Sequence, residues 1–290
     1  MRCSEARSVS SGPLLWRRMS SSNRRCLVSF TKPVHRNYRA IKPGPNAGYS
    51  GWAYIEDHDY AKRAEHYVRA FMMIQQDLRL LFEYVEPSDQ SRLAYSYRIH
   101  ALLMRTCIEI EANFRAILEE NNFTTPPRRS LNMTDYRKVD VTHHLSSYRV
   151  MLPIWDGAPL IVAPFEVWRP FRGLAHSGGI GLPWYQAYNA SKHDRQQEFK
   201  KANFENLISA VTGLLVVISS QFRDRDFDAG PAALLVSGHD YHAMEAATGG
   251  LFRISYPHDW SDSELYDFEW GALKTKNDRF AKIDYDSIPS

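Results

Sequence analysis

The chain has 290 residues, of which 44% are hydrophobic and 24% are charged. A chain of this composition can bury a core, so we exclude an intrinsically disordered protein. The longest apolar runs, such as residues 214–218, are far shorter than the roughly 18 residues that span a bilayer. We therefore also exclude a transmembrane protein.

The net charge of +3 is unevenly distributed along the chain. Residues 1–45 hold ten Lys and Arg against the single acid Glu5, which leaves a net charge of −6 for the rest. The basic charge is therefore no evidence that the folded part binds nucleic acid. We predict a basic, disordered leader over residues 1–45. A mitochondrial presequence and an upstream extension that precedes a true start at Met19 are the alternatives.

The cysteines argue against a disulfide framework and against a thiolate zinc site. There are three, Cys3, Cys26 and Cys107, and no Cys-x-x-Cys pair. The leader also lacks the apolar segment of a secretory signal. We expect a reducing compartment and a cytoplasmic protein.

Helical periodicity dominates the first half of the chain. A Pro/Gly linker at residues 42–53 precedes apolar positions that recur every three or four residues over 57–85. The pattern breaks at residues 87–89 and resumes over 92–122. Asp89 or Ser91 is the expected cap of this second helix. We predict that these two helices pack antiparallel as a hairpin.

The second stripe places Ile110 and Phe114 in the core between the first two helices. A shorter third helix is expected over residues 134–147. The stretch 148–183 has no helical period and is rich in Pro and aromatic residues, so we expect it to cover a site or to seal the core.

The helical period returns over residues 184–222, where Asn203 is a candidate internal cap. The pattern then changes to alternation over 252–256 and over 266–270, which predicts a β-hairpin. The fold class that follows is mainly α, an antiparallel helical bundle with a small C-terminal β appendage. The predicted domains are a leader (1–45), a helical domain (46–228) and a β-containing tail (229–290).

The densest polar segment is residues 184–195. Under a helical period one stripe of this region holds Tyr185, Asn189, His193 and Gln197, and the next holds Tyr188, Lys192 and Arg195. A histidine can move a proton at a phosphate ester while cations neutralise the developing charge. The competing interpretation is a structural histidine that bonds Glu109 or Glu111.

Two segments resemble the motifs of HEPN domains. The sequence Cys-Ile-Glu-Ile-Glu-Ala-Asn-Phe-Arg-Ala-Ile-Leu at residues 107–118 is similar to the HEPN helix with the pattern E-x-x-x-K-x-x-L. The sequence Asn189-x-x-Lys192-His193 is similar to the signature in which Arg and a polar residue precede His. The combination also resembles a group of uncharacterised bacterial proteins with a Tyr-Asn-x-x-Lys-His-Asp-Arg box. The resemblance covers residues 57–222.

This resemblance implies a bundle of four or five helices, usually dimeric. Active HEPN members cleave RNA without a metal, by attack of a 2′-hydroxyl on the adjacent phosphate, and serve in toxin–antitoxin and anti-phage systems. By position, His193 matches the HEPN histidine and Asn189 the polar residue, but Tyr188 stands in place of the arginine. Lys192 or Arg195 would have to supply the missing cation.

From this we take His193, Asn189, Lys192 and Arg195 as candidate catalytic residues, with Tyr188 and Glu109 as supporting residues. The predicted function is RNA binding or metal-independent RNA cleavage, without a cofactor. The predicted partners are RNA, an antitoxin or defence protein and a second copy of the chain, and no membrane. The alternative is a non-enzymatic scaffold or interaction protein.

Two other groups of residues were weaker candidates. Arg172 and His176 also pair Arg with His, but their spacing is one residue short of the signature and their context is that of a loop. His143-His144 and His239-x-x-His242 lack the spacing of metal ligands, so we expect surface histidines and no metal site.

Overall fold

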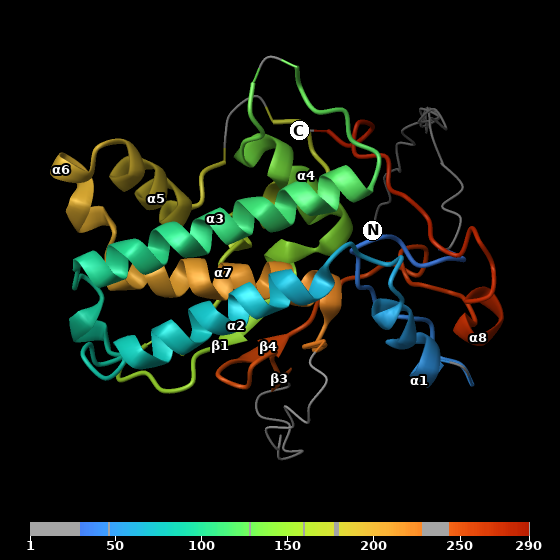
Figure 1. Ribbon diagram of the computed structural model, residues 1–290, viewed down its shortest axis with the longest axis horizontal. Coiled ribbons are helices and arrows are strands. Elements are labelled where there is room, and N and C mark those ends of the chain that lie inside the picture. Colours follow the sequence, from blue (N-terminus) through green and yellow to red (C-terminus); the bar gives the residue numbers. More distant parts are fainter. Residues whose placement is uncertain are drawn as a thin grey trace, which may run out of the picture.

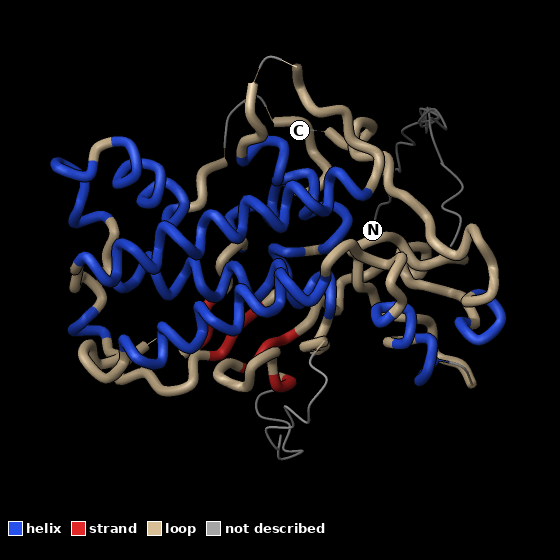
Figure 2. Tube along the Cα trace, viewed as in Figure 1, coloured by secondary structure: helices blue, strands red, loops and turns tan. Residues whose placement is uncertain are grey.

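The computed structural model describes residues 30–45, 47–127, 129–158, 160–176, 180–227 and 244–289. Helices dominate these residues, and a small antiparallel sheet lies beside them (Figures 1 and 2). The predicted mainly α class with a small β part is therefore confirmed. The described parts of the predicted leader and tail, residues 30–45 and 244–289, belong to the folded body, contrary to the expectation.

Three long helices form the centre of the molecule: α2 (Ala64–Leu81), α3 (Tyr97–Glu120) and α7 (Phe204–Phe222). Helix α3 packs against both α2 and α7 (Figure 1). Two of the helices begin where a side chain accepts a hydrogen bond from the first turn. Ser96 caps α3 at 3.2 Å from the Ile99 amide, and Asn203 caps α7 as predicted.

The predicted starts of the first two helices were too early. Before α2 the chain forms the 3₁₀ helix η1 (Ala53–Glu56) and turns, and Arg63 has a left-handed backbone with φ of 54°. An L-residue in that conformation cannot continue a right-handed helix. Before α3 lies η2 (Asp89–Ser91), so neither Asp89 nor Ser91 is the cap.

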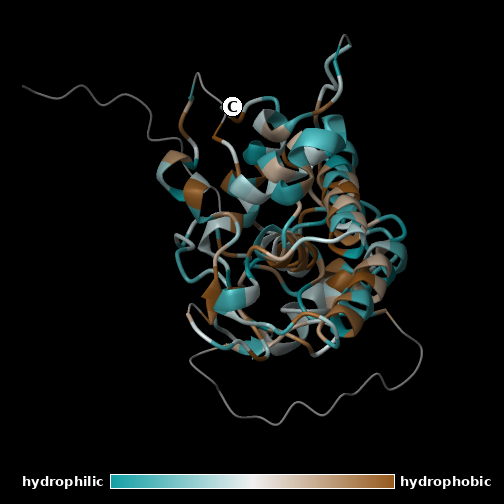
Figure 3. Cartoon of the chain, turned by 90° about the vertical axis from the view of Figure 1, so that its left-hand side faces the viewer, coloured by the Kyte–Doolittle hydropathy of each residue, from teal (hydrophilic) through white to brown (hydrophobic). Residues whose placement is uncertain are grey.

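Helix α7 is the core of the protein. Every residue from Ala210 to Phe222 is buried, and hydrophobic residues gather at the centre of the view in Figure 3. By length and composition α7 is the one helix among the described residues that is apolar enough to cross a membrane. However, 83% of its most apolar window is buried inside the protein, as in the central helix of a soluble protein.

Shorter helices surround this centre. A capping box of Asn132 and Asp135 starts α4 (Met133–His143), which η3 (Leu145–Ser147) follows. The 3₁₀ helix η4 (Glu166–Phe171) lies within the Pro-rich stretch. The remaining helices are α1 (Ala47–Ser50), α5 (Pro183–His193), α6 (Arg195–Glu198), η5 (Phe199–Lys201) and α8 (Trp270–Leu273).

The predicted core positions on α3 are confirmed as buried. Ile110 and Phe114 have no exposed surface. The ring of Phe114 stacks on Tyr136 of α4 at 5.0 Å and also contacts Phe165, the N-cap of η4, and Trp168 within η4. The Pro-rich stretch therefore does seal the core, as expected.

The four strands among the described residues pair antiparallel in the order β2-β1-β4-β3. They are β1 (Arg149–Met151), β2 (Ile161–Val162), β3 (Glu245–Ala246) and β4 (Arg253–Ser255). The predicted pairing of 252–256 with 266–270 is wrong. Strand β4 pairs instead with β1, and Tyr266 bridges to Phe30 and Ile41.

The described part of the predicted tail, residues 244–289, is consequently no appendage. Ile254, Tyr266 and Tyr285 are fully buried in the same core as the long helices. The part of the predicted tail at residues 229–243 lies outside the described residues.

The predicted boundary of the leader at residue 45 is also wrong, because residues 30–45 belong to the folded body. Arg36 is completely buried, with Nε at 2.8 Å from Glu120 and Nη1 at 2.9 Å from Gln221 of α7. Lys32 and Lys42 form ion pairs with acids of the C-terminal segment. These basic residues thus form ion pairs within the folded body. The prediction for residues 1–29 lies outside the described residues.

Candidate functional site

The polar segment 184–195, which we call the α5 box, lies at one end of the molecule, on α5 and α6 (Figure 1). Pro183 occupies the first turn of α5, and the helix ends at His193 because Asp194 leaves the helical conformation and caps α6. Tyr185, Asn189 and His193 therefore share one helix as predicted, whereas Gln197 belongs to the next.

His193 is exposed at the C-terminal end of α5. Among the described residues no hydrogen bond or ion pair reaches its ring. The predicted structural tie to Glu109 or Glu111 is therefore not present. Lys192 is exposed too, and its Nζ donates a 3.0 Å hydrogen bond to the Tyr188 hydroxyl.

Other members of the α5 box attach the helix to the body. Tyr188 is buried, and the Tyr185 hydroxyl donates to Glu111 of α3 at 2.8 Å. Burial and this bond raise the pKa of Tyr185 far above its ordinary value. Glu109 is half-buried, which raises the pKa of its carboxyl, and its backbone carbonyl accepts from Asn113. Glu109 thus has no contact with the catalytic candidates in the described chain.

An aromatic cluster lies directly beside Arg195. The Arg195 guanidinium is 5.7 Å from the centre of the Tyr97 ring, and that ring lies 4.9 Å from Phe199 of η5. Phe199 also contacts Tyr95 and His100. Tyr97 is 69% exposed. We call Tyr95, Tyr97, His100 and Phe199 the Tyr97 cluster, which sequence patterns did not indicate because α6 and α3 are about 100 residues apart.

Two open pockets flank α5, and Gln186 lines both. One, of about 400 Å³, is bounded by Lys200 and Lys201 of η5. The other, of about 410 Å³, lies between α5 and the start of α4 and contains Asn189 and Arg137. Asn189 is thus placed in a pocket, while His193 and Arg195 are on the open surface.

The weaker candidate Arg172 proves to be part of a partly buried ion cluster. Its guanidinium contacts Asp140 and Asp259 and donates to Ser146 and Ser147. His144 joins the same cluster: Nδ1 is 3.0 Å from Asp259, Nε2 is 3.2 Å from Glu264, and the ring stacks on Trp260 at 3.8 Å. These contacts join the segment after α4 to residues 259–264, so we regard this cluster as structural.

The expectation of surface histidines is wrong for His143 and His144, which are both buried. The Nε2 atom of His143 is hydrogen-bonded to the backbone carbonyl of Arg36 at 2.8 Å, and its Nδ1 atom is hydrogen-bonded to the Thr142 hydroxyl. Burial lowers the pKa of His143 to about 3, so the ring is neutral. With both nitrogens engaged, it offers no metal ligand. His239 and His242 lie outside the described residues.

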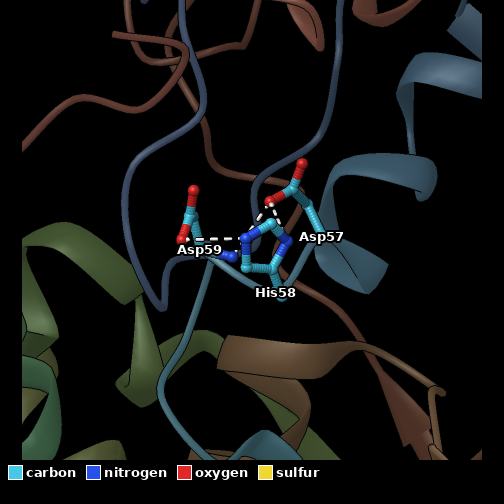
Figure 4. A group of neighbouring side chains, drawn as sticks. All are labelled: Asp57, His58 and Asp59. Carbon is cyan, nitrogen blue, oxygen red and sulfur yellow. Dashed lines mark hydrogen bonds and ion pairs between the residues drawn. The ribbon is translucent and has the colours of Figure 1, made fainter. Parts of the chain in front are cut away.

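One group of side chains in the described chain has the spacing of a metal site: Asp57, His58 and Asp59 (Figure 4). Their ligand atoms lie within 4.8 Å of one another. However, Arg279 already binds both carboxylates. The cation that this group needs is therefore supplied by the protein itself.

Comparison with known proteins identifies no family for this chain. The chain matches no family model, no curated protein and no solved structure at a significant level.

Proposed function

We propose that this chain is a HEPN-like RNA-binding protein whose binding surface consists of Lys192, His193, Arg195 and the Tyr97 cluster. The observation that carries the proposal is the exposed ring of Tyr97 with the Arg195 guanidinium over it. Proteins that bind single-stranded RNA combine aromatic platforms for the bases with cations for the phosphates. The helices around α5 would then form the antiparallel bundle that the resemblance implies.

The charged side chains of this surface are accessible to a ligand in solution. His193 and Arg195 are exposed, and Lys192 is held by Tyr188 rather than by an acid. A cation without an acidic partner is free to neutralise a phosphate. Lys201, in contrast, pairs with Glu198, and Asp194 is engaged as the cap of α6.

Cleavage requires more than binding, and in this proposal His193 supplies it. Its imidazole would take the proton from a 2′-hydroxyl or give one to the leaving 5′-oxygen, while Lys192 or Arg195 stabilises the charge on the phosphate. The proposal includes a cytoplasmic homodimer with a role beside an antitoxin or defence partner, because active HEPN proteins work in that way.

The binding part is tested by fluorescence anisotropy with a labelled oligouridine of about 12 nucleotides, a length within the range of single-strand sites. Tyr97→Ala should weaken binding by the loss of one stacking partner, roughly 10-fold. Tyr49→Ala is the matched control. Tyr49 is 43% exposed with Lys274 at 5.8 Å from its ring, but its helix, α1, lies at the opposite end of the molecule from α5 and α6 (Figure 1). Equal affinities of the two variants would contradict the proposal.

A scaffold without enzymatic activity is the second candidate, and one observation favours it. The hydroxyl of Tyr185 and the buried ring of Tyr188 use part of the α5 box to fix α5 to the body. If the wild type neither binds nor cuts RNA at physiological salt, this scaffold function replaces the first proposal.

A further inference from the structure

Arg137 is an unpaired guanidinium at the wall of a pocket. Its side chain lies on α4, and the residue is only 6% exposed. Neither Nη1 nor Nη2 has a hydrogen-bond partner within the described part of the chain. A buried guanidinium that lacks partners costs several kcal/mol, so such donors are normally satisfied.

The acids near Arg137 are engaged elsewhere. Asp135 accepts two hydrogen bonds from Arg129, at 2.6 and 2.8 Å, and also closes the capping box of α4. Asp140, on the following turn, binds Ser146 and lies beside Arg172. No acid of α4 therefore neutralises Arg137.

The pocket that Arg137 lines has the size and chemistry of a small-molecule site. Its volume is about 410 Å³, within the range of ligand pockets. The other polar residues of its wall are neutral: Asn132, Thr134, Tyr185, Gln186 and Asn189. Arg137 is thus the one charged residue of the lining among the described residues.

We propose that this pocket binds the oxyanion of a small molecule, a phosphate or a carboxylate, with Arg137 as its principal ligand. A planar guanidinium binds two oxygens of either group at once, which satisfies the two unpaired nitrogens. The amides of Gln186 and Asn189 supply neutral donors at the opposite wall, on α5. The ligand neutralises the buried charge on binding, and this site is independent of RNA binding at the Tyr97 cluster.

The rim of the pocket depends on a glycine. A Cβ at Gly181 would lie 2.1 Å from the Gln186 Nε2 atom. Gly181→Ala therefore displaces the Gln186 amide without changing any charge. This substitution separates the geometry of the pocket from the charge of Arg137.

The test is thermal unfolding of the full chain in inorganic phosphate, adenosine monophosphate or succinate, each against KCl at equal ionic strength. We expect at least one of these anions to raise the Tm of the wild type, by roughly 5 °C or more at about 100 times its Kd. Phosphate and adenosine monophosphate identify a phosphate site, and succinate alone identifies a carboxylate site.

Arg137→Met should abolish the shift and, because it removes an unpaired buried charge, should not lower the Tm in KCl. Arg137→Lys and Gly181→Ala should weaken binding by at least 10-fold, and the exposed Arg149→Met should change nothing. A wild type that responds to none of the anions would overturn the proposal. So would an anion-dependent shift that persists in a folded Arg137→Met variant, or one that is undiminished in a folded Arg137→Lys variant.

Discussion

The ring of Phe114 shows what a single buried residue contributes to this fold. It stacks on Tyr136 and contacts two aromatic rings at η4, so its removal leaves a cavity between three elements. We expect Phe114→Ala to lower the free energy of unfolding by about 3–5 kcal/mol in urea titrations. The control is Ile108→Ala on the same helix, 54% exposed, which should cost far less. Similar losses for both variants would contradict the phase of α3.

The His144 cluster predicts a loss of stability in acid. Burial alone would raise the pKa of Glu264, but bonds from His144 and Ser261 outweigh it and lower that pKa to about 2. Likewise, burial of Asp259 is outweighed by bonds from His144, Ser147 and Arg172, which hold its pKa well below the ordinary value. Both carboxyls bind protons more readily in the unfolded state, so their contribution is complete above about pH 5.

This contribution should fall as the pH drops below the unfolded pKa values of 4.5 and 3.8 and be absent below the folded values. The measurement is urea unfolding between pH 7 and pH 2.5. Asp259→Asn should lower stability at pH 7 and flatten the decline toward acid. An Asp259→Asn protein with the pH profile of the wild type would show that the cluster does not couple to protonation.

Residues of this kind mark the limit of prediction from sequence. The apolar stripe of α3 identified Phe114 as buried, because periodicity reports which face turns inward. It did not identify Tyr136 as the stacking partner. The partners of His144 are 115 and 120 residues away, and nothing local in the sequence indicates them. For the same reason the orphaned guanidinium of Arg137 was not foreseen.

At the scale of elements, the segment 30–45 is the most consequential correction. Arg36 bonds Gln221 and pairs with Glu120, whose side chain is itself nearly buried. Arg36→Met leaves the Glu120 charge without its partner, which should cost about 3–5 kcal/mol. A chain that lacks residues 1–45 should therefore lose a large part of its thermal stability.

The control for this deletion is a chain that starts at residue 30, which keeps Arg36 and should melt close to the full-length protein. Circular dichroism melts of the three proteins decide the matter. If the chain that lacks residues 1–45 melts at the temperature of the other two, the segment 30–45 does not stabilise the body, and the original boundary of the leader is correct.

Element types were predicted better than element ends and partners. The apolar periodicity predicts the long helices. The starts of α2 and α3, however, are set by the backbone conformations of Arg63 and Ser96, about which the apolar pattern carries no information. The alternation at 252–256 correctly indicated extended backbone at β4. It could not choose the partner, because β1 is about 100 residues away and alternation reports only which side chains share a face.

For the whole molecule, the charge distribution changes once residues 30–45 join the body. Residues 30–290 contain 30 Lys and Arg against 32 Asp and Glu, a formal charge of −2. RNA binding by such a body cannot rest on a general positive field, so it must rest on few contacts and on stacking. With Lys192 and Arg195 of the proposed surface and the neighbouring Lys200 as cations, log K should fall with log salt with a slope of about −2.

That slope is measured by anisotropy with oligouridine between 50 and 200 mM KCl, on the chain that starts at residue 30 if it folds as expected. A much steeper slope would mean that charges outside the proposed surface dominate. Tyr97→Ala should lower the affinity without changing the slope, because an aromatic ring releases no counterions. A change in slope for this variant would contradict stacking as its role.

His193 is the residue on which RNA cleavage is expected to depend. His193 is exposed and has no partner in the described chain, so His193→Ala should keep the Tm of the wild type and thereby exclude a structural tie. If the protein is a ribonuclease of the HEPN kind, the same variant should lose RNA cleavage completely. Arg195→Ala should reduce cleavage, because it removes a cation beside the phosphate. Cleavage should withstand a chelator and should accompany the mass of a dimer in light scattering. Retained cleavage by folded His193→Ala would place the activity elsewhere, and chelator-sensitive cleavage would contradict a mechanism in which imidazole and cations alone move the proton and balance the charge.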